Sequence, residues 1–483
     1  MNILKIIAGL SVGTLLCAAA AMAEVGAQNR TSGATFTPCP SKATLLSQSI
    51  QSDTVTPCVA IVIFHPNVLQ PEQKGIVGNK GAQFRAGLPL INGTAVYVPN
   101  DDALSGLLHD PRVLDIRPDG RVSIQGPPGS CTPWPECKNG DGGGDGGGSS
   151  AQVDPAGYLR IGANAVAATG AGIGVAIVDT GVDQDHADID GNLAAPCFTA
   201  YTSCDDDNGH GTHVAGIVAA ENNDQDIVGV APEATIYAVK VLDSSGSGLF
   251  SDVLSGLQWV YNLNSAVPET SPVPIQVVNM SLGAEAVCGR PDDPGLYTYI
   301  QTLADQGVVV VVAPGNDSSK EVFDMLPAGC PGVLAIASTT AQAGTNKCKV
   351  LSGYVGADTA SYFTTDGAFD GTVGVTISAP GETYENNTCG TIQSKGILSL
   401  AAGGGTTEKN GTSMAAPHVA GVAALMLQAN GALSPFTVRS IIRASASNVE
   451  SAPIDHPFIS ESLDGELEGI VNAPGAVAMA AGL

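Results

Sequence analysis

Short, largely apolar runs recur from residue 151 onward and constrain the fold of this chain most strongly. They lie at residues 175–178, 236–241, 277–280, 308–312 and 333–337. Stretches of helical length alternate with them, such as 251–262 and 417–428. Apolar strands separated by helices are typical of a parallel sheet that helices cover on both faces, because neither face then meets water. We therefore expect residues 151–483 to form a doubly wound α/β domain with a mostly parallel sheet.

The preceding part of the chain has a different pattern. Residues 24–125 contain strand-like runs at 59–64 and 93–98, followed by a short helix candidate at 101–109. This order predicts a small α+β domain. Residues 126–150 are rich in glycine, cannot bury apolar surface, and are predicted to be a flexible linker that proteases can reach.

The first 23 residues have the pattern of a secretory signal peptide. Lys5 precedes an apolar run at 6–21, and Ala-Met-Ala at 21–23 suits a signal peptidase. A membrane anchor is one alternative, but the run is short for a span and no second hydrophobic segment follows it. A lipoprotein modified at Cys17 is another, but Leu16 is bulky where a small residue is expected. We expect cleavage near Ala23, secretion to the extracellular space or periplasm, and no membrane association afterwards.

Cysteine usage agrees with export. The chain has eleven cysteines, and ten remain when Cys17 leaves with the signal peptide. An even number in an exported chain favours disulfides, and the absence of a C-x-x-C pair disfavours zinc. The connectivity stays open, although neighbours along the chain are plausible pairs: Cys39/Cys58, Cys131/Cys137, Cys197/Cys204, Cys288/Cys330 and Cys348/Cys389.

Composition excludes several classes of protein. Hydrophobic residues make up 44 % of the chain, which suffices for a sizeable core. Acidic residues outnumber basic ones by 46 to 20, giving a formal net charge of −26. A protein of this charge repels polyanions at long range, so nucleic acid is not an expected partner.

Three segments carry residues capable of catalysis: Val-Ala-Ile-Val-Asp179-Thr-Gly, Asn-Gly-His210-Gly-Thr-His213 and Gly-Thr-Ser413-Met-Ala-Ala-Pro-His. Each has a simpler explanation when taken alone. An aspartate at a strand end can cap a turn, and a serine can cap a helix. His210 and His213 could suggest a zinc pair, but they lack the H-E-x-x-H spacing and its glutamate. We expect His213 to pack in the core.

Together the three segments are far more specific. They follow the order Asp, His, Ser, whereas an α/β-hydrolase presents its serine first within G-x-S-x-G. The segments closely resemble the three signatures of the subtilase family of serine peptidases, and the resemblance extends over essentially the whole chain after the signal. It implies that Ser413 is the nucleophile, His210 the general base and then acid, and Asp179 the group that orients the imidazole.

The resemblance also implies groups that bind the substrate. Asn316 matches the family's oxyanion asparagine, whose amide acts with the backbone N–H of the nucleophile. Ser281 and Gly283 lie in a segment that resembles the one pairing with the substrate as an added strand. Gly315 belongs to the expected wall of the side-chain pocket. A protein or peptide is therefore the expected substrate.

A structural calcium ion is a further implication of the resemblance. Calcium prefers a shell of oxygen ligands from carboxylates, amides and backbone carbonyls. The positions that match the family's ligands are the side chains of Gln152, Asp188 and Asn223 and the carbonyls of Glu221, Gln225 and Ile227.

Residues 24–125 resemble the family's inhibitor prodomain, chiefly through Ile-Asn-Gly-Thr-Ala-Val-Tyr-Val and Pro-Arg-Val-Leu-Asp-Ile-Arg-Pro-Asp. This implies an intramolecular folding aid that inhibits the active cleft until the precursor cuts itself within about residues 125–150. A monomer is expected.

Two other functions agree less well with the sequence. A catalytically silent binding protein on the same scaffold lacks a triad member, whereas all three are present here together with Asn316. An esterase or lipase needs a lid or an acyl pocket, which the sequence does not indicate. We therefore expect a secreted serine endopeptidase that acts through an acyl-enzyme.

Overall fold

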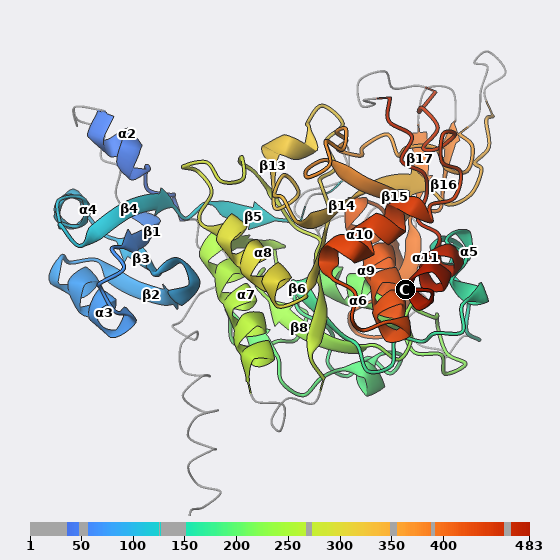
Figure 1. Cartoon of the computed structure of the whole chain (residues 1–483), viewed down its shortest axis with the longest axis horizontal. Helices are drawn as coiled ribbons and strands as arrows, with labels where there is room; N and C mark the ends of the chain where they lie inside the picture. Colours follow the sequence, from blue (N-terminus) through green and yellow to red (C-terminus); the bar gives the residue numbers. More distant parts are fainter. Residues whose placement is uncertain are drawn as a thin grey trace, which may run out of the picture.

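The structure is a computed structural model that describes residues 36–47, 57–124, 126, 151–266, 273–347, 355–387, 392–457 and 465–483. The predicted signal peptide lies outside these residues, and so does the predicted linker apart from Gly126. Within the described ranges, no helix combines the length and apolar character needed to cross a bilayer. The secondary structure gathers into a smaller N-terminal unit and a larger α/β unit (Figure 1).

A seven-stranded parallel sheet forms the centre of the larger unit, in the order β15-β14-β12-β10-β6-β8-β7. Nearly all of its residues are buried, which explains the continuous apolar runs in the sequence. The predicted parallel α/β fold is therefore confirmed. The strands are β6 (Gly174–Asp179), β7 (Phe198–Thr199), β8 (Thr235–Lys240), β10 (Ile275–Met280), β12 (Val309–Val312), β14 (Val333–Thr340) and β15 (Val375–Glu382).

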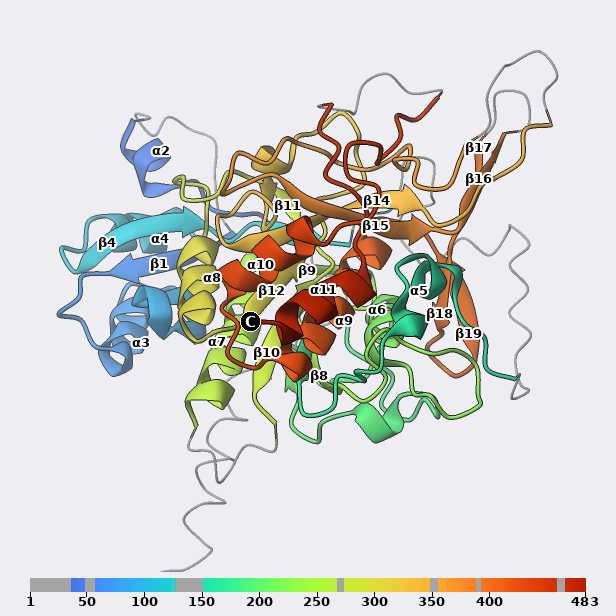
Figure 2. The same ribbon diagram turned by 45° about the vertical axis from the view of Figure 1, so that its right-hand side comes forward.

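Helices cover both faces of this sheet (Figure 2). On β6, Val175 and Ile177 join the core under helices α6 and α9, whereas Ala176 and Val178 join the core under α7 and α8. This alternation within one strand makes the fold doubly wound. The helices are α5 (Ala156–Arg160), α6 (His210–Ala219), α7 (Phe250–Ser265), α8 (Leu296–Asp305), α9 (Thr412–Ala429), α10 (Pro435–Ala444) and α11 (Ala473–Ala481).

The N-terminal unit is an antiparallel sheet in the order β2-β3-β1-β4 with helices on one face. The opposite face contributes Ile61, Ile63 and Leu88 to the core that includes α7 and α8. Asp119 accepts hydrogen bonds from Ser251 N (2.9 Å) and Oγ (2.7 Å) at the start of α7. The elements are α2 (Lys42–Ser47), β1 (Cys58–Phe64), α3 (Gln70–Asn79), β2 (Gln83–Leu88), β3 (Gly93–Val98), α4 (Asp101–Leu108) and β4 (Val113–Pro118).

Small antiparallel pairs complete the fold. They are β5 (Arg121–Ser123) with β9 (Ser247–Leu249), β11 (Ala284–Glu285) with β13 (Met325–Leu326), β16 (Tyr384–Asn387) with β17 (Ile392–Lys395), and β18 (Ile397–Leu400) with β19 (Thr406–Lys409). Short 3-10 turns occur at η1 (Pro89–Ile91), η2 (Ala163–Ala165), η3 (Asp190–Asn192) and η4 (Val322–Asp324).

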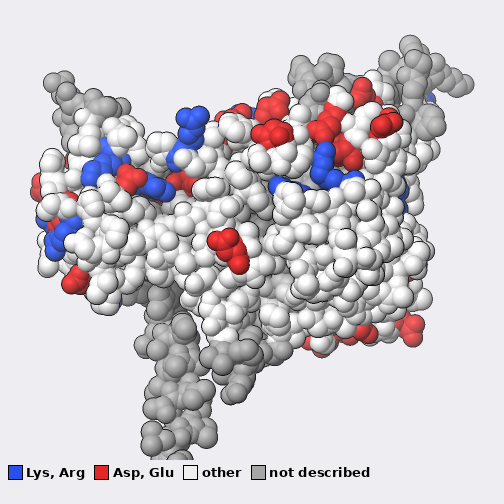
Figure 3. All heavy atoms as spheres, viewed as in Figure 1, with Lys and Arg blue, Asp and Glu red and all other residues white. Residues whose placement is uncertain are grey.

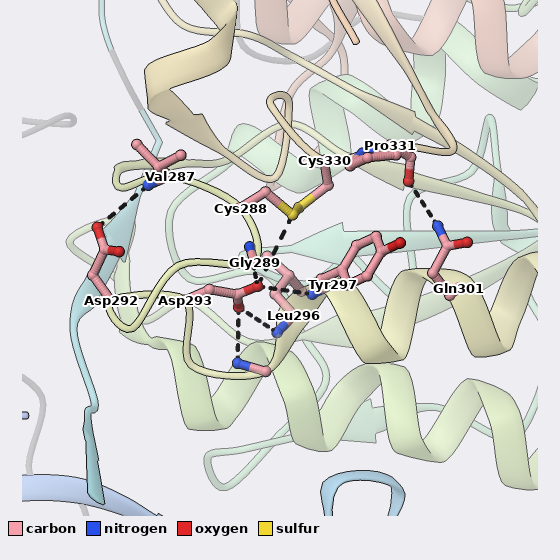
Figure 4. The surroundings of a disulfide bond; sticks show 11 residues. Val287, Cys288, Gly289, Asp292, Asp293, Leu296, Tyr297, Gln301, Cys330 and Pro331 are labelled. Atoms are coloured by element: carbon pink, nitrogen blue, oxygen red, sulfur yellow. Dashed lines mark hydrogen bonds between the residues drawn. A yellow bond between two sulfur atoms is a disulfide. The ribbon is translucent and has the colours of Figure 1, made fainter. Parts of the chain in front are cut away.

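Three of the predicted disulfides form, namely Cys39–Cys58, Cys197–Cys204 and Cys288–Cys330. Cys131, Cys137, Cys348 and Cys389, the other predicted partners, lie outside the described residues. Figure 4 shows the third bridge beside the N-terminus of α8, where Asp293 accepts hydrogen bonds from the amides of Gly295 (2.8 Å) and Leu296 (2.7 Å). This bridge joins the loop before α8 to the loop that leads into β14.

Candidate active site

The end of β6 and the start of α6 bring Asp179 and His210 together. Nδ1 of His210 lies 2.8 Å from Oδ1 and 3.0 Å from Oδ2 of Asp179. Asp179 is fully buried, so its carboxylate depends on such donors, and Thr180 N supplies another at 2.7 Å. A proton on Nδ1 satisfies this contact and leaves Nε2 of a neutral ring as a proton acceptor.

Glycines flank His210 because the backbone requires them. Gly209 has φ of 92°, in the left-handed region that glycine adopts without strain. A Cβ on Gly211 would lie 2.1 Å from the carbonyl oxygen of Gly181, so helix α6 packs against the loop after β6 only with glycine there. The two glycines therefore set the distance between His210 and Asp179.

Asp206, which sequence reasoning missed, holds the two segments in place. Its carboxylate accepts hydrogen bonds from Thr180 Oγ1 (2.9 Å), Gly209 N (2.8 Å), Thr212 N (2.9 Å) and Thr212 Oγ1 (2.6 Å). Thr180 Oγ1 in turn accepts from Gly211 N at 2.9 Å. An aspartate four residues before a helix-starting histidine was the available signal, because such residues often bind orphan helix amides.

Ser413 is the second residue of α9, and its side chain shares a pocket with His210. Its Oγ donates a hydrogen bond to the carbonyl oxygen of Ser281 at 3.3 Å. The pocket is lined by Ile124, Gly126, His210, Lys409, Asn410, Ser413 and Met414.

Asn316 lies beside the loop that carries Ser413. Its Oδ1 accepts a hydrogen bond from Thr412 N at 2.8 Å, which fixes the orientation of the amide. Gly315, its neighbour, has φ of 133°, and its carbonyl oxygen accepts from Thr412 Oγ1 at 3.1 Å. The structure thus brings the predicted oxyanion and pocket residues next to the predicted nucleophile.

Lys409 is a cation in this pocket that sequence reasoning did not identify. Burial lowers its pKa from 10.5 to about 8, while the charges of Asp206 and Asp179 act in the opposite direction.

His213 hydrogen-bonds through Nε2 to the carbonyl oxygens of Ile397 (3.0 Å) and Thr407 (3.2 Å). It therefore packs in the core, as predicted.

The chain leaving the N-terminal unit enters the same pocket. β5 pairs antiparallel with β9, and Ser123 exchanges two backbone hydrogen bonds with Gly283, of 3.1 and 3.0 Å. Ile124 N then donates to the carbonyl oxygen of Gly246 at 3.0 Å. Residues 121–124 thus form a strand added between β9 and Gly283, and the next described residue, Gly126, lines the pocket with His210 and Ser413.

The predicted calcium ligands lie close together around a loop. Nε2 of Gln152 donates to the carbonyl oxygens of Glu221 and Ile227, each at 2.8 Å. Oδ2 of the buried Asp188 accepts from Ile227 N at 3.2 Å. Oδ1 of Asp188 is buried without a hydrogen-bond partner in the described structure, and burial raises the pKa of this carboxyl from 3.8 to about 7.

The two remaining predicted ligands are on the same loop, where Asn223 Oδ1 accepts from Gln225 N at 3.0 Å. No group of three or more His, Cys, Asp or Glu residues is placed to bind a metal in the described ranges. The predicted calcium ligands would not form such a group, because they combine one carboxylate with amide and carbonyl oxygens.

The fold and the pocket define a serine hydrolase with an Asp–His pair at a strand end and a serine at a helix start. The profile of the Subtilase family matches residues 170–459. Subtilisin DY of Bacillus licheniformis is 34 % identical over 308 residues, which cover 62 % of this chain and 93 % of that protein. The chain therefore belongs to the Subtilase family and is a serine endopeptidase.

Two further comparisons cover a larger share of this chain than the family profile does. Subtilisin E of Bacillus subtilis is 28 % identical over 382 residues, covering 78 % of this chain and 81 % of that protein. A solved structure of proteases from Pseudoalteromonas arctica aligns with 68 % of this chain and 100 % of its own, with 28 % identity and a TM-score of 0.53.

Proposed function

We propose that this endopeptidase is secreted as a precursor and cuts peptide bonds through an acyl-enzyme formed on Ser413. The observation that carries the proposal is the hydrogen bond between buried Asp179 and His210, a residue that lines the same pocket as Ser413. Nε2 of His210 takes the proton of Ser413 Oγ as the oxygen attacks the substrate carbonyl, and then returns it to the leaving amine. Asp179 keeps the ring in the required tautomer and stabilises the imidazolium.

Asn316 and the backbone N–H of Ser413 are proposed to stabilise the tetrahedral oxyanion. Thr412 N already holds Oδ1 of the Asn316 amide, so the Nδ2 group is the donor end. In subtilisin, a relative of this chain, removing one such donor raises the barrier by about 2.7–4 kcal/mol.

We propose that substrates bind as an added strand between β9 and Gly283, with Ser281 and Gly315 as further contacts. The support comes from residues 121–124 of the same chain, which hydrogen-bond to Ser247–Leu249, Gly283 and Gly246 in this manner. Backbone pairing of this kind accepts many sequences, because it reads few side chains.

The N-terminal unit is proposed to be an inhibitor that the enzyme removes from itself. It covers α7 and α8, and its last strand leads into the pocket. Ile124 and Gly126 both line the pocket with Ser413, so we propose the bond between Gln125 and Gly126 as the one that is cut. This bond lies at the start of the range expected from the sequence.

Calcium is proposed to stabilise the fold at the Gln152 loop. The buried, unpartnered Oδ1 of Asp188 fits a cation, and a rotated Gln152 amide would present its oxygen beside the carbonyl oxygens of Glu221 and Ile227. The proposed holders are Gln152, Asp188, Asn223, Glu221, Gln225 and Ile227. The ion would neutralise the charge of Asp188 and join the loop to residue 152.

The test is the intact mass of the secreted wild type beside Ser413→Ala, with calcium present. We expect the wild type to begin at Gly126, and the variant to keep residues 24–125. Two full-length proteins would contradict self-processing. Identical trimming of both would show that another protease makes the cut.

A further inference from the structure

Two carboxyl groups and a histidine that the proposed mechanism does not use are buried together beside the nucleophile loop. Glu382 ends β15 and Glu385 lies in β16, and each is 0 % exposed. His456, from the segment 451–457, places Nε2 2.8 Å from Oε2 of Glu385. Charged side chains are rarely buried so completely, so their protonation has to be consistent with their contacts.

The hydrogen bonds favour a proton on Glu382. Oε1 of Glu385 accepts from Tyr362 N at 3.3 Å, and a neutral His456 ring that carries its proton on Nε2 would donate to Oε2. Oε2 of Glu382 accepts from Ser394 Oγ, whereas its buried Oε1 makes no hydrogen bond among the described residues, and the hydroxyl of Ser361 also lies near this carboxyl. The two carboxyls are neighbours in this buried cluster, and each affects the protonation of the other. A proton on Glu382 gives this carboxyl a donor as well as an acceptor and removes the repulsion between two buried anions.

Electrostatics favours the same assignment. Two neighbouring buried carboxylates repel each other and are poorly solvated, so one of them takes up a proton. Burial, followed by the charge of Glu385, raises the pKa of Glu382 well above its usual value, whereas the rise that burial causes in the pKa of Glu385 is opposed by the side chain of Glu382 and the amide of Tyr362. Tyr362 faces the pair from the segment that begins at residue 355, and burial raises its pKa to about 12, so it stays neutral.

A chain of hydrogen bonds connects Glu382 to the pocket. Ser394 Oγ, which donates to Glu382, accepts from Nδ2 of Asn410 at 2.9 Å. Asn410 lines the pocket with Ser413, three residues further along the chain. The backbone runs alongside, because Gly411 N donates to the carbonyl oxygen of Gly381 at 3.0 Å.

We propose that protonated Glu382 is a positioning residue for catalysis, holding Asn410 through Ser394 and with it the turn that presents Ser413. This inference rests on the proposed role of Ser413 as the nucleophile. A carboxylic acid can donate to Glu385 and accept from Ser394 at once, whereas a carboxylate can only accept.

Ionisation of Glu382 should therefore loosen the turn at alkaline pH. The titratable groups that face it are Glu385 from β16, His456 from 451–457, and Tyr362. Lys395 follows Ser394 in β17, but its ammonium pairs with Glu408 at 3.1 Å. Once Glu382 is charged, two adjacent anions repel, and the Ser394 link to Asn410 is disturbed.

The experiment compares kcat, KM and the pH profile of active-site-titrated enzyme variants on a peptide substrate. We expect Ser394→Ala to lower kcat about fivefold to tenfold, as for one lost hydrogen bond, with KM changed less than twofold. Glu382→Ala should lower kcat similarly, and Glu382→Gln should restore most of it, because an amide donates and accepts in the same positions. The alkaline limb of kcat should move to higher pH in Glu382→Gln, whose side chain cannot ionise.

Ser440→Ala is the matched control, because its hydroxyl lies on the exposed surface of α10 and donates within its own helix to Phe436 at 2.9 Å. A purely structural role would lower the unfolding temperature of Ser394→Ala and leave kcat per titrated site within twofold, and that result would overturn the inference. So would an alkaline limb that is the same in the wild type and in Glu382→Gln. If Ser394→Ala does not mature, the Glu382→Gln profile alone decides. If Ser413 is not the nucleophile, Ser413→Ala will be as active as the wild type. This outcome is distinct from the two that would overturn the role of Glu382.

Discussion

Oγ of Ser281 donates a hydrogen bond to the carbonyl oxygen of Ser413 at 3.0 Å, in the place of the N–H that Pro417 lacks. Within a helix this carbonyl would accept from the residue four positions later, and proline has no amide hydrogen. Ser281 therefore allows α9 to begin ahead of a proline, which puts Ser413 in the first turn. Asn279 Nδ2 donates to the same hydroxyl at 3.0 Å and holds it.

Loss of the Ser281 hydroxyl should lower the unfolding free energy by a smaller amount when Pro417 is also replaced. Ser281→Ala leaves the buried carbonyl without its donor, so we expect a loss of about 1–3 kcal/mol in unfolding free energy. In a Pro417→Ala background the restored N–H takes over, and the loss should shrink. Urea unfolding of the four combinations in the Ser413→Ala background, which prevents autolysis, measures the difference. Equal costs in both backgrounds would refute this relationship.

Asp206 should matter for stability far more than its neighbour. Asp206→Asn replaces an acceptor of hydrogen bonds with a group that carries its own donors, so α6 loses part of its connection to β6. We expect a loss of about 3 kcal/mol, as for hydrogen bonds to a buried charge. Asp205→Asn, at an exposed site, serves as the control in the same urea experiment. If Asp206→Asn lowered the unfolding free energy by less than about 0.5 kcal/mol, the role of Asp206 in holding α6 would be contradicted.

Calcium removal should make stability fall with rising pH. The pKa of Asp188 is raised from 3.8 to about 7, chiefly by burial, so between these values the folded protein keeps a proton that the unfolded chain has released. This contribution is present at low pH and is lost as pH rises through about 7. Thermal unfolding of Ser413→Ala in chelator should show the fall, and calcium should remove it. A fall that calcium does not change would speak against the site.

Lys409 should give the opposite slope at alkaline pH. Burial lowers its pKa from 10.5 to about 8, so between these values the unfolded chain binds the extra proton. Stability therefore gains from deprotonation as pH rises across this interval. Lys409→Met should remove that gain, which shows as a difference between the unfolding curves of the two proteins at pH 8 and pH 10. Parallel curves would show that the ammonium is not desolvated in the folded state.

The parallel sheet could be predicted from the sequence because its strands are buried on both faces. Val175–Val178 and Val309–Val312 therefore read as continuous apolar runs. The start of α9 was predicted too late, at residue 417, because the donor that compensates for Pro417 comes from Ser281, far away in the chain. Strand β15 was not predicted, since it contains Pro380 and Gly381, which strands usually avoid.

The candidate catalytic residues were recognisable because each lies in a local signature. Asp206 left only a capping signal ahead of the helix. Lys409 and Glu382 left none, because their significance depends on burial, and burial is a property of the folded chain. The Glu382–Glu385 pair becomes visible only when the hairpin of β16 and β17 places Ser394 beside it.

The central claim is that Ser413 is the nucleophile of a peptidase, and covalent labelling tests it most directly. The mature enzyme is treated with a fluorophosphonate, and peptide mass mapping locates the adduct while residual hydrolysis of a peptide is followed. We predict one adduct per molecule, on Ser413, forming in proportion to the loss of activity and absent from Ser413→Ala. Full inactivation with the label on another residue, or full labelling of Ser413 with activity retained, would contradict the account.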